Sequence, residues 1–263
     1  MSSVSHASAR VCWRSLLFGL AFAVLTLLPA VSAPAAEETA TKSKKTATAA
    51  GARVATHNDL TYSTVDGEEL KLDLAVPTAG EGPYPMVVFI HGGGWAGGNR
   101  VSFRSQIQQA ARRGYVAATV SYRLMQYDRE NKETTTAKKA FPDQVHDVKA
   151  AIRWLRANAA EYHADPERIG VIGFSAGGHL VLMLGLTDED SGLEGEGGNP
   201  KVSSRVQAVV NVFGPTEMKS AWKQSSVAWI YRLFMGGTPE EAAEHYRLAS
   251  PVTWVSKDDP PVL

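Results

Sequence analysis

Two short runs of alternating hydrophobic and polar residues stand at the start of the folded part of the chain. Leu60 and Tyr62 alternate with polar residues up to the pair Asp66-Gly67, and the run from Leu70 to Val76 then places an apolar residue at every second position. Alternation with a period of two is typical of a strand with one buried face, and an Asp-Gly pair between two such runs favours a tight turn. The pattern predicts an antiparallel hairpin.

Continuous apolar runs follow, and they have the length of strands. Strands of a parallel sheet are covered on both faces and are therefore apolar throughout. Buried strands are predicted in this way over residues 86–90, 115–120, 169–174 and 206–213.

Segments with helical spacing lie between these runs. In the helix expected from Pro142-Asp143 onward, Val145, Val148, Ile152 and Leu155 fall on one side. A hairpin followed by alternating strands and helices predicts a three-layer α/β fold with a mostly parallel sheet, in which ligands bind beyond the carboxyl ends of the strands. Other expected features are helices over 103–113 and 176–186, a helical excursion over 216–234, a turn at Asp165-Pro166 and an acidic, glycine-rich loop over 188–199.

The N-terminal part of the chain has a different character. Basic residues precede an apolar run over 16–28, and small residues follow it, which is typical of a secretory signal peptide. We therefore expect a signal peptide over 1–36 and an exported protein, periplasmic or secreted. The alternative is a retained membrane anchor, since the apolar run with its alanine flank is nearly long enough to span a bilayer. Residues 37–56, rich in Ala, Thr and Lys, indicate a flexible linker before a folded domain over 57–263.

Composition narrows the function only a little. The chain has 27 basic and 27 acidic residues, so no basic excess points to nucleic acid. Cys12 is the only cysteine and lies in the expected signal segment, which leaves the mature protein without a disulfide, a cysteine-ligated metal or a cysteine nucleophile.

One short motif carries a candidate nucleophile. Gly173-Phe-Ser-Ala-Gly177 has the form Gly-x-Ser-x-Gly, which alone is modest support. An apolar strand enters the motif and an apolar helix leaves it, and this is the context that a nucleophile elbow requires. Small flanking residues let the turn close so that the hydroxyl of Ser175 stands above the sheet. The pattern predicts Ser175 as the catalytic nucleophile; the alternative is a serine in an ordinary glycine-rich turn.

A glycine-rich segment follows the strand expected over 86–90. Its sequence is His91-Gly-Gly-Gly-Trp95, and consecutive glycines allow N–H groups to converge on one point. Backbone N–H groups placed in this way stabilise the negative charge that develops on a substrate carbonyl oxygen. We therefore assign the oxyanion hole to the amides of Gly93, Gly94 and Ala176. A phosphate-binding loop is the alternative, but no Lys-Ser/Thr pair and no dinucleotide fingerprint accompany the glycines.

Two further segments, Ser121-Tyr-Arg123 and Asp147 to Leu155, complete a set with the glycine segment and the elbow. Together they resemble the α/β-hydrolase esterases of the hormone-sensitive-lipase-like and feruloyl- or acetyl-esterase-like groups, over nearly the whole chain from about residue 60. The resemblance implies hydrolysis of small carboxylic esters through an acyl-enzyme, with no metal or organic cofactor. It also implies that His91 braces the oxyanion loop instead of acting as a base, and that His179 packs or hydrogen-bonds behind the elbow.

The resemblance further implies a triad whose acid and histidine follow the serine along the chain. The acid would come after a strand that begins near Val262, and the chain ends at Leu263. We therefore expect an α/β-hydrolase domain that lacks its last strands and helices, as from a truncated reading frame. Its sheet would keep an exposed apolar edge.

Other histidines and carboxylates are weaker candidates for the base and the acid. His179 lies one turn along the elbow helix, and its side chain would have to turn back across Gly178. His245 lies in a helix expected to be solvated, and Asp258 and Asp259 precede the last strand instead of following it. The groups in an earlier helix match its structural pattern: Asp143, His146 and Asp147.

An exported serine carboxylesterase that forms an acyl-enzyme at Ser175 is the function that these motifs favour. The alternative is a catalytically inactive remnant of the fold, because the triad acid and base are not found. A peptidase of the prolyl-oligopeptidase type shares the elbow, but nothing before residue 60 could form its gating domain. Trp95, Trp222 and Trp229 could line a pocket for an aromatic or sugar ester, although core packing is favoured for each.

Overall fold

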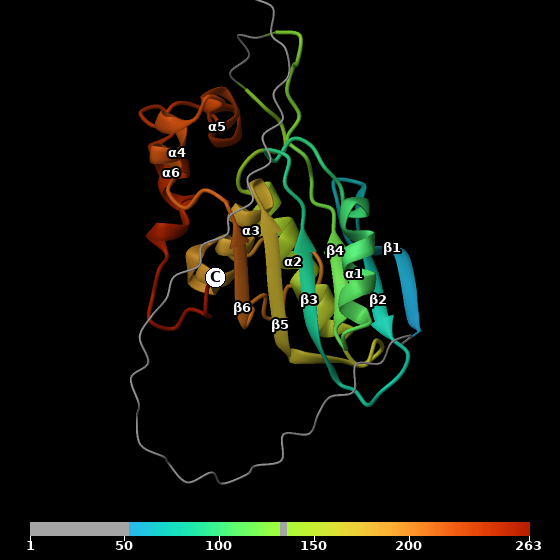
Figure 1. Cartoon of the computed structure of the whole chain (residues 1–263). Coiled ribbons are helices and arrows are strands. Elements are labelled where there is room, and N and C mark those ends of the chain that lie inside the picture. The colour runs from blue at the N-terminus through green and yellow to red at the C-terminus, as the bar shows by residue number, and fades with distance from the viewer. Residues whose placement is uncertain (1–52, 132–135) are drawn as a thin grey trace, which may run out of the picture. The chain divides into compact units, whose positions relative to one another are not determined.

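The computed structural model describes residues 53–131 and 136–263, so the expected signal peptide and nearly all of the expected linker lie outside the described residues. The described part contains a six-stranded sheet with the order β1-β2-β4-β3-β5-β6 (Figure 1). β2 pairs antiparallel with β1 and β4, whereas β4, β3, β5 and β6 run parallel to one another. The strands are β1 (Val54–Val65), β2 (Glu68–Pro77), β3 (Tyr84–Ile90), β4 (Val116–Val120), β5 (Ala164–Phe174) and β6 (Ala208–Val212).

The predicted hairpin is formed by β1 and β2, with Asp66-Gly67 at its turn. Both turn residues have a positive φ, 49° for Asp66 and 78° for Gly67, which is the backbone geometry that an Asp-Gly turn supplies. β1 begins at Val54, where Val54 pairs with Pro77. Residues 54–56 therefore belong to the hairpin and not to a linker.

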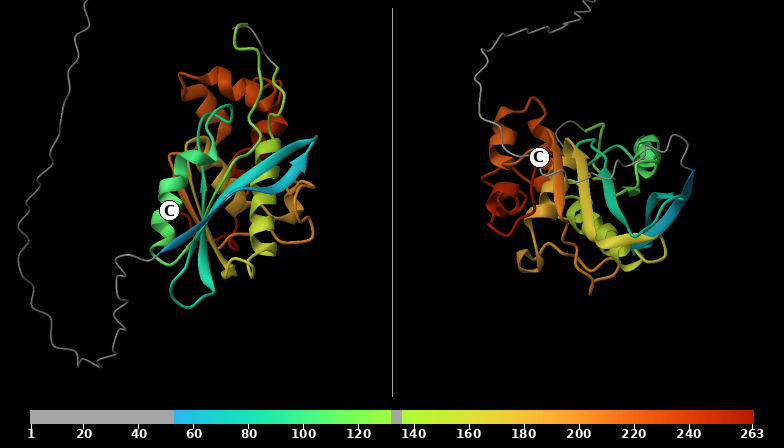
Figure 2. Two further views of the ribbon diagram at one scale, coloured as in Figure 1. Left: turned by 90° about the vertical axis from the view of Figure 1, so that its right-hand side faces the viewer. Right: turned by 60° about the horizontal axis from the view of Figure 1, so that its bottom comes forward.

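Helices cover both faces of the sheet and produce the three layers that the sequence predicts. α1 packs against β2 and β4 on one face, whereas α2 and α3 pack against the other (Figures 1 and 2). Alternate residues of β3 serve the two faces, since Val88 and Ile90 belong to the large core and Val87 and Phe89 pack towards α1. The helices are α1 (Arg104–Ala111), α2 (Asp143–Ala157), α3 (Ala176–Leu186), α4 (Met218–Gln224), α5 (Ala228–Met235) and α6 (Ala243–Leu248), with short 3-10 turns η1 (Arg100–Phe103), η2 (Glu189–Ser191) and η3 (Pro251–Thr253).

The interpretation of Asp165-Pro166 as a turn is wrong, because both residues lie within β5. The register between β3 and β5 shifts between Tyr84 and Met86. In this irregular stretch the Asp165 carboxylate accepts a hydrogen bond from the Glu167 amide at 2.9 Å. The turn chemistry of an Asp-Pro pair is thus accommodated as an irregularity inside a long strand.

The helical excursion predicted over 216–234 is confirmed, and it forms α4 and α5, which lie beyond the carboxyl ends of the strands together with α6 (Figure 1). A backbone hydrogen bond of 3.1 Å from Phe141 to the Phe234 carbonyl ties α5 to the start of α2. No helix within residues 53–131 and 136–263 is both long and apolar enough to cross a membrane.

The strand expected at Val262 begins to form beside β6. Val209 donates to the Pro261 carbonyl at 3.0 Å, Leu263 donates to the Val209 carbonyl at 2.9 Å, and Val262 bridges Val209 in parallel. β6 is therefore paired on both sides over part of its length.

Candidate active site

Ser175 lies in a sharp turn between β5 and α3. Its φ of 54° and ψ of −119° are strained for a residue with a side chain, and its amide donates to the Val212 carbonyl at 2.9 Å. Both flanks have no room for a side chain: a Cβ on Gly173 would lie 2.1 Å from the Gly177 carbonyl oxygen across the turn, and one on Gly177 would lie 2.3 Å from the Ile90 carbonyl oxygen of β3. The predicted strand–turn–helix around Ser175 is confirmed as geometry.

The glycine loop lies directly against this turn. A Cβ on Gly92 would lie 2.6 Å from the Phe174 carbonyl oxygen and 3.3 Å from the Ser175 Cβ. Gly93 and Gly94 follow with φ of 120° and 59°, values that favour glycine. The structure therefore brings the glycine loop and Ser175, which are more than eighty residues apart in the sequence, into contact.

The backbone amides assigned to the oxyanion hole are free to bind a ligand. In the part of the chain that the structure describes, the N–H groups of Gly93, Gly94 and Ala176 donate to no other protein group. Ala176 is the first residue of α3, and the positive end of a helix dipole favours a developing negative charge. The arrangement is suited to stabilising an oxyanion, and the roles of these three residues stay a prediction.

His91 is buried behind the glycine loop. Its Nδ1 lies 2.8 Å from the Gly92 carbonyl oxygen, which only accepts, so Nδ1 carries the proton and donates. The ring stacks on Tyr122 at 4.3 Å, and the Tyr122 hydroxyl donates to the His91 carbonyl at 2.9 Å. Burial lowers the pKa of His91 despite the hydrogen bond to Gly92, so the ring is neutral at pH 7. This geometry supports the predicted bracing role.

Tyr122 is a supporting residue to which the sequence reasoning gave no role. It stands in the Ser121-Tyr-Arg123 segment that carries part of the resemblance, so its position in that motif was the available signal. Arg123 in the same segment forms a buried ion pair with Asp147 at 2.7 Å, which joins the segment to α2. Asp147 is thus structural, as the sequence indicates.

His179 is completely buried on α3. Its Nε2 lies 2.8 Å from the Ala249 carbonyl oxygen, and its Nδ1 accepts a hydrogen bond of 3.3 Å from the Trp95 indole. Both ring nitrogens are therefore engaged away from Ser175. Burial lowers the pKa of His179 to about 4. The predicted role in packing and hydrogen bonding agrees with this position.

The remaining candidates for base and acid are also engaged elsewhere. His245 is exposed on α6, with its Nδ1 2.7 Å from the Met235 carbonyl oxygen. Asp259 accepts from the Ser256 amide at 2.7 Å, and Asp258 lies exposed beside it, so both belong to a surface turn. Within residues 53–131 and 136–263, no histidine or carboxylate forms a hydrogen bond with the Ser175 hydroxyl.

The tryptophans differ in their surroundings. Trp95 is buried and Trp222 packs partly against the core, as expected. Core packing is wrong for Trp229, which is 50% exposed. α5 buries its last turn, so the first turn, which carries Trp229, faces outward and places the indole 5.6 Å from the Tyr127 ring.

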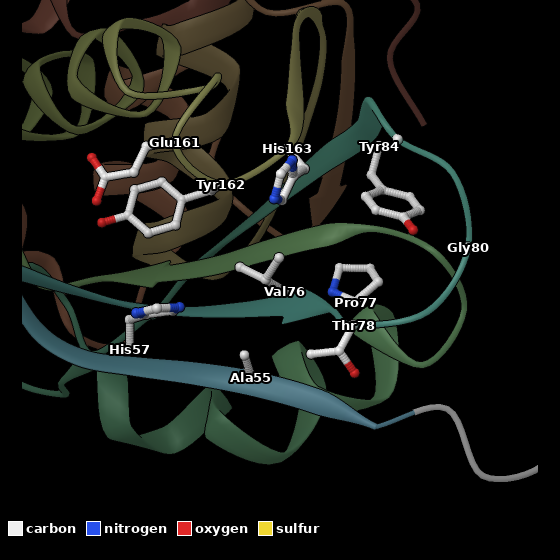
Figure 3. A pocket seen from close by; sticks show the side chains of 11 residues that line it. Ala55, His57, Val76, Pro77, Thr78, Gly80, Tyr84, Glu161, Tyr162 and His163 are labelled. Carbon is white, nitrogen blue, oxygen red and sulfur yellow. The ribbon is translucent and has the colours of Figure 1, made fainter.

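Two cavities lie at opposite ends of the sheet. One, of about 510 Å³, is beside the glycine loop and is lined in part by His91, Gly98, Tyr127 and Arg129. The other, of about 440 Å³, is drawn in Figure 3 and lies near the start of β3, far from Ser175 along the strands. The predicted nucleophile and oxyanion residues follow β5 and β3 and therefore lie at the carboxyl end of the sheet. Within the described ranges, no cluster of His, Cys, Asp or Glu side chains is placed to hold a metal ion.

A serine in a strained turn after a buried parallel strand, with a glycine loop against it on a three-layer sheet, defines an α/β-hydrolase of the esterase class. Comparison with known families agrees with this class. The BD-FAE family model matches residues 72–263, and the chain belongs to this family of carboxylic ester hydrolases. The resemblance inferred from the sequence motifs is confirmed.

Relatives and solved structures support the same class. Esterase LipC of Mycobacterium tuberculosis is 32% identical over 190 residues, which covers 69% of this chain and 43% of LipC. A carbohydrate esterase from gut microbiota superposes with a TM-score of 0.65 at 27% identity, covering 79% of this chain and 75% of that one. The butyrate-bound esterase Est2 of Thermogutta terrifontis gives 0.59 at 30% identity, covering 81% and 70%. The chain spans 40–43% of the length of the mycobacterial esterases LipC, LipM and LipQ.

Proposed function

We propose that this protein hydrolyses small carboxylic esters through an acyl-enzyme at Ser175. The observation that carries the proposal is the contact of the glycine loop with the elbow, where a Cβ on Gly92 would lie 3.3 Å from the Ser175 Cβ. Free backbone amides and the candidate nucleophile thereby meet at one point. Membership of a carboxylic ester hydrolase family adds support.

The proposed chemistry has two steps. The Ser175 oxygen attacks the ester carbonyl carbon while a general base takes its proton, and the amides of Gly93, Gly94 and Ala176 stabilise the oxyanion. Collapse of the intermediate breaks the ester bond and releases the alcohol, which receives the proton from the base. A water molecule then attacks the acyl-enzyme in the same way and releases the carboxylic acid.

The step that the described residues do not supply is the removal of the proton from Ser175. No general base contacts its hydroxyl within residues 53–131 and 136–263. This observation favours the second candidate, a hydrolase fold without catalysis, and turnover therefore separates the two.

The test is ester turnover and covalent labelling by the full chain. We expect hydrolysis of p-nitrophenyl butyrate, a probe chosen because Est2 binds butyrate, and rapid labelling by a fluorophosphonate. Both should be abolished in Ser175→Ala and retained in Ser105→Ala, which removes an exposed hydroxyl on α1. A folded parent protein that neither turns over the ester nor reacts with the probe would establish the inactive alternative.

We also propose that the protein is exported and that residues 1–36 are removed. The support is the order of basic residues, apolar run and small residues in the sequence. N-terminal sequencing of the protein recovered from the native host should give a start near residue 37 in the periplasm or medium. Recovery of the uncleaved chain with the membrane fraction would establish the anchored alternative.

A further inference from the structure

Trp95 fixes the end of the glycine loop in the core. Its side chain is 2% exposed, and its ring stacks on Phe234 of α5 at 4.2 Å with an interplanar angle of 7°. The Tyr231 ring meets its edge at 5.6 Å. The residue that follows the predicted oxyanion amides is therefore held by aromatic packing on α5.

A hydrogen bond from the indole also fixes the orientation of the Trp95 ring. The Trp95 indole nitrogen only donates, so the Nδ1 of His179, 3.3 Å away, accepts. Nε2 of His179 must then carry the ring proton, and it donates to the Ala249 carbonyl at 2.8 Å. One neutral imidazole thus joins the glycine loop to the segment between α6 and η3.

His179 is also tied to the elbow itself. Its amide donates to the Ser175 carbonyl at 3.0 Å, so the ring stands one helical turn from the candidate nucleophile. This is a backbone bond of α3, so the side chain that accepts from Trp95 stands on the helix that begins at the elbow. Two aromatic rings also pack edge-on with the imidazole, with centroid distances of 5.5 Å for Trp95 and 6.1 Å for Phe234.

We propose that His179 is a positioning residue that holds Trp95 and thereby fixes the amides of Gly93 and Gly94 relative to Ser175. The inference rests on the proposed function, because it concerns the same oxyanion hole. Three consecutive glycines allow many backbone conformations, and oxyanion stabilisation requires donors fixed before the reaction. The bond from Trp95 to His179 restricts the loop at the residue next to Gly94.

The two hydrogen bonds of His179 can be removed separately. In His179→Asn the side-chain oxygen can take the place of Nδ1 and accept from Trp95. In His179→Gln the amide reaches the place of Nε2 and can donate to Ala249, while the Trp95 indole loses its acceptor. Trp95→Phe keeps an aromatic ring for Phe234 to stack on and deletes the donor. His57→Gln, at an exposed histidine in the cavity of Figure 3, is the matched control.

The experiment measures kcat and KM for p-nitrophenyl butyrate, and hydrogen exchange of the Ala96 and Met125 amides, which donate to the Gly93 and Trp95 carbonyls of the loop at 3.1 and 2.8 Å, for the full chain and each variant. In His179→Gln and Trp95→Phe we expect kcat to fall about tenfold with KM changed less than about twofold, and faster exchange of both amides. His179→Asn should lose less than about threefold in kcat and keep slow exchange. His57→Gln should match the parent in both measurements.

The exchange arm decides the inference even without turnover. Parent-like exchange in both His179→Gln and Trp95→Phe overturns the proposal, and so does an equal loss in His179→Asn and His179→Gln. Faster exchange in those two variants, with slow exchange in His179→Asn, supports the positioning role. If the variants show this exchange pattern but the parent hydrolyses no ester, the proposed function is wrong while the positioning role of His179 is supported.

Discussion

A Cβ on Gly94 would lie 2.4 Å from the Cδ1 of Ile230, so α5 rests directly on the glycine loop. Gly94 also has a φ of 59°, a backbone conformation that side chains disfavour. The backbone conformation therefore favours glycine at a predicted oxyanion residue, and a methyl group there would force the end of the Ile230 side chain or the loop to move.

Gly94→Ala should lower kcat for an ester substrate about tenfold, because the methyl group displaces the loop from Ser175. It should also cost about 1 kcal/mol of unfolding free energy, measured by urea denaturation, through the left-handed backbone. Adding Ile230→Val, which removes Cδ1, should restore part of kcat. The control is Gly192→Ala, at a φ of 71° with nothing within 4 Å, which should lose stability alone. Equal losses of kcat in both alanine variants would contradict the argument.

The strain at Ser175 separates stability from activity. Its φ of 54° costs about 1–3 kcal/mol in a residue with a Cβ, and alanine retains that cost. Ser175→Gly relieves this strain, but glycine also loses more conformational entropy on folding than alanine does. The unfolding free energy of Ser175→Gly should therefore exceed that of Ser175→Ala by about 1 kcal/mol. Both variants should be inactive. An alanine variant at least as stable as the glycine variant would show that the elbow is unstrained.

Much of this arrangement could be predicted because its signals are local. The residues that close the elbow are contiguous from Gly173 to Gly177, and the buried strand that enters it is a continuous apolar run. Parallel strands place their carboxyl ends at one edge of the sheet, so the sequence places the glycine loop and the elbow at the same edge.

The parts that were missed depend on contacts between distant segments. Nothing in the sequence near Gly94 indicates Ile230, and nothing near His179 indicates the Ala249 carbonyl as its partner. Residue type alone favours core packing for Trp229, because tryptophan is usually well buried, but α5 turns its buried end towards Trp95 and exposes its first turn. Tertiary packing, and not residue type, decided these positions.

Burial of His179 makes stability depend on pH. Its pKa is about 4 in the folded protein, mainly through burial, and 6.5 is the ordinary value that the unfolded chain recovers. As pH falls from 6.5 towards 4, His179 binds a proton in the unfolded chain but not in the folded protein. The free energy of unfolding therefore falls in this window and not above it.

Comparison with His179→Asn isolates this contribution, since carboxylates titrate alike in both proteins. The stability advantage of the parent over His179→Asn should shrink by about 2–3 kcal/mol between pH 7 and pH 4.5. Urea denaturation at the two pH values measures it. A difference between the two proteins that does not change with pH would mean that His179 is hydrated in the folded state.

Glu194 neutralises two buried cations of α2. Its carboxylate lies 2.9 Å from the Arg153 guanidinium and also contacts the Lys149 ammonium. The side chain of Arg153 is 1% exposed and that of Lys149 is 0% exposed. Burial raises the pKa of Glu194, but the pull of Lys149 and Arg153 outweighs it, so the carboxyl's pKa lies below its ordinary value. Burial lowers the pKa of Lys149 even with this partner present.

Glu194→Gln should therefore destabilise the protein by about 3 kcal/mol at pH 7, because two desolvated cations lose their counter-charge. The deficit should shrink as pH rises towards 10, since Lys149 can then lose its proton in the folded variant. Combining Glu194→Gln with Lys149→Met should recover part of the loss at pH 7. Glu189→Gln, at an exposed position in the same loop, is the control and should change stability by less than about 0.5 kcal/mol. Urea denaturation across this pH range measures all four proteins, and a loss in Glu194→Gln no larger than in Glu189→Gln would show that the cations need no partner.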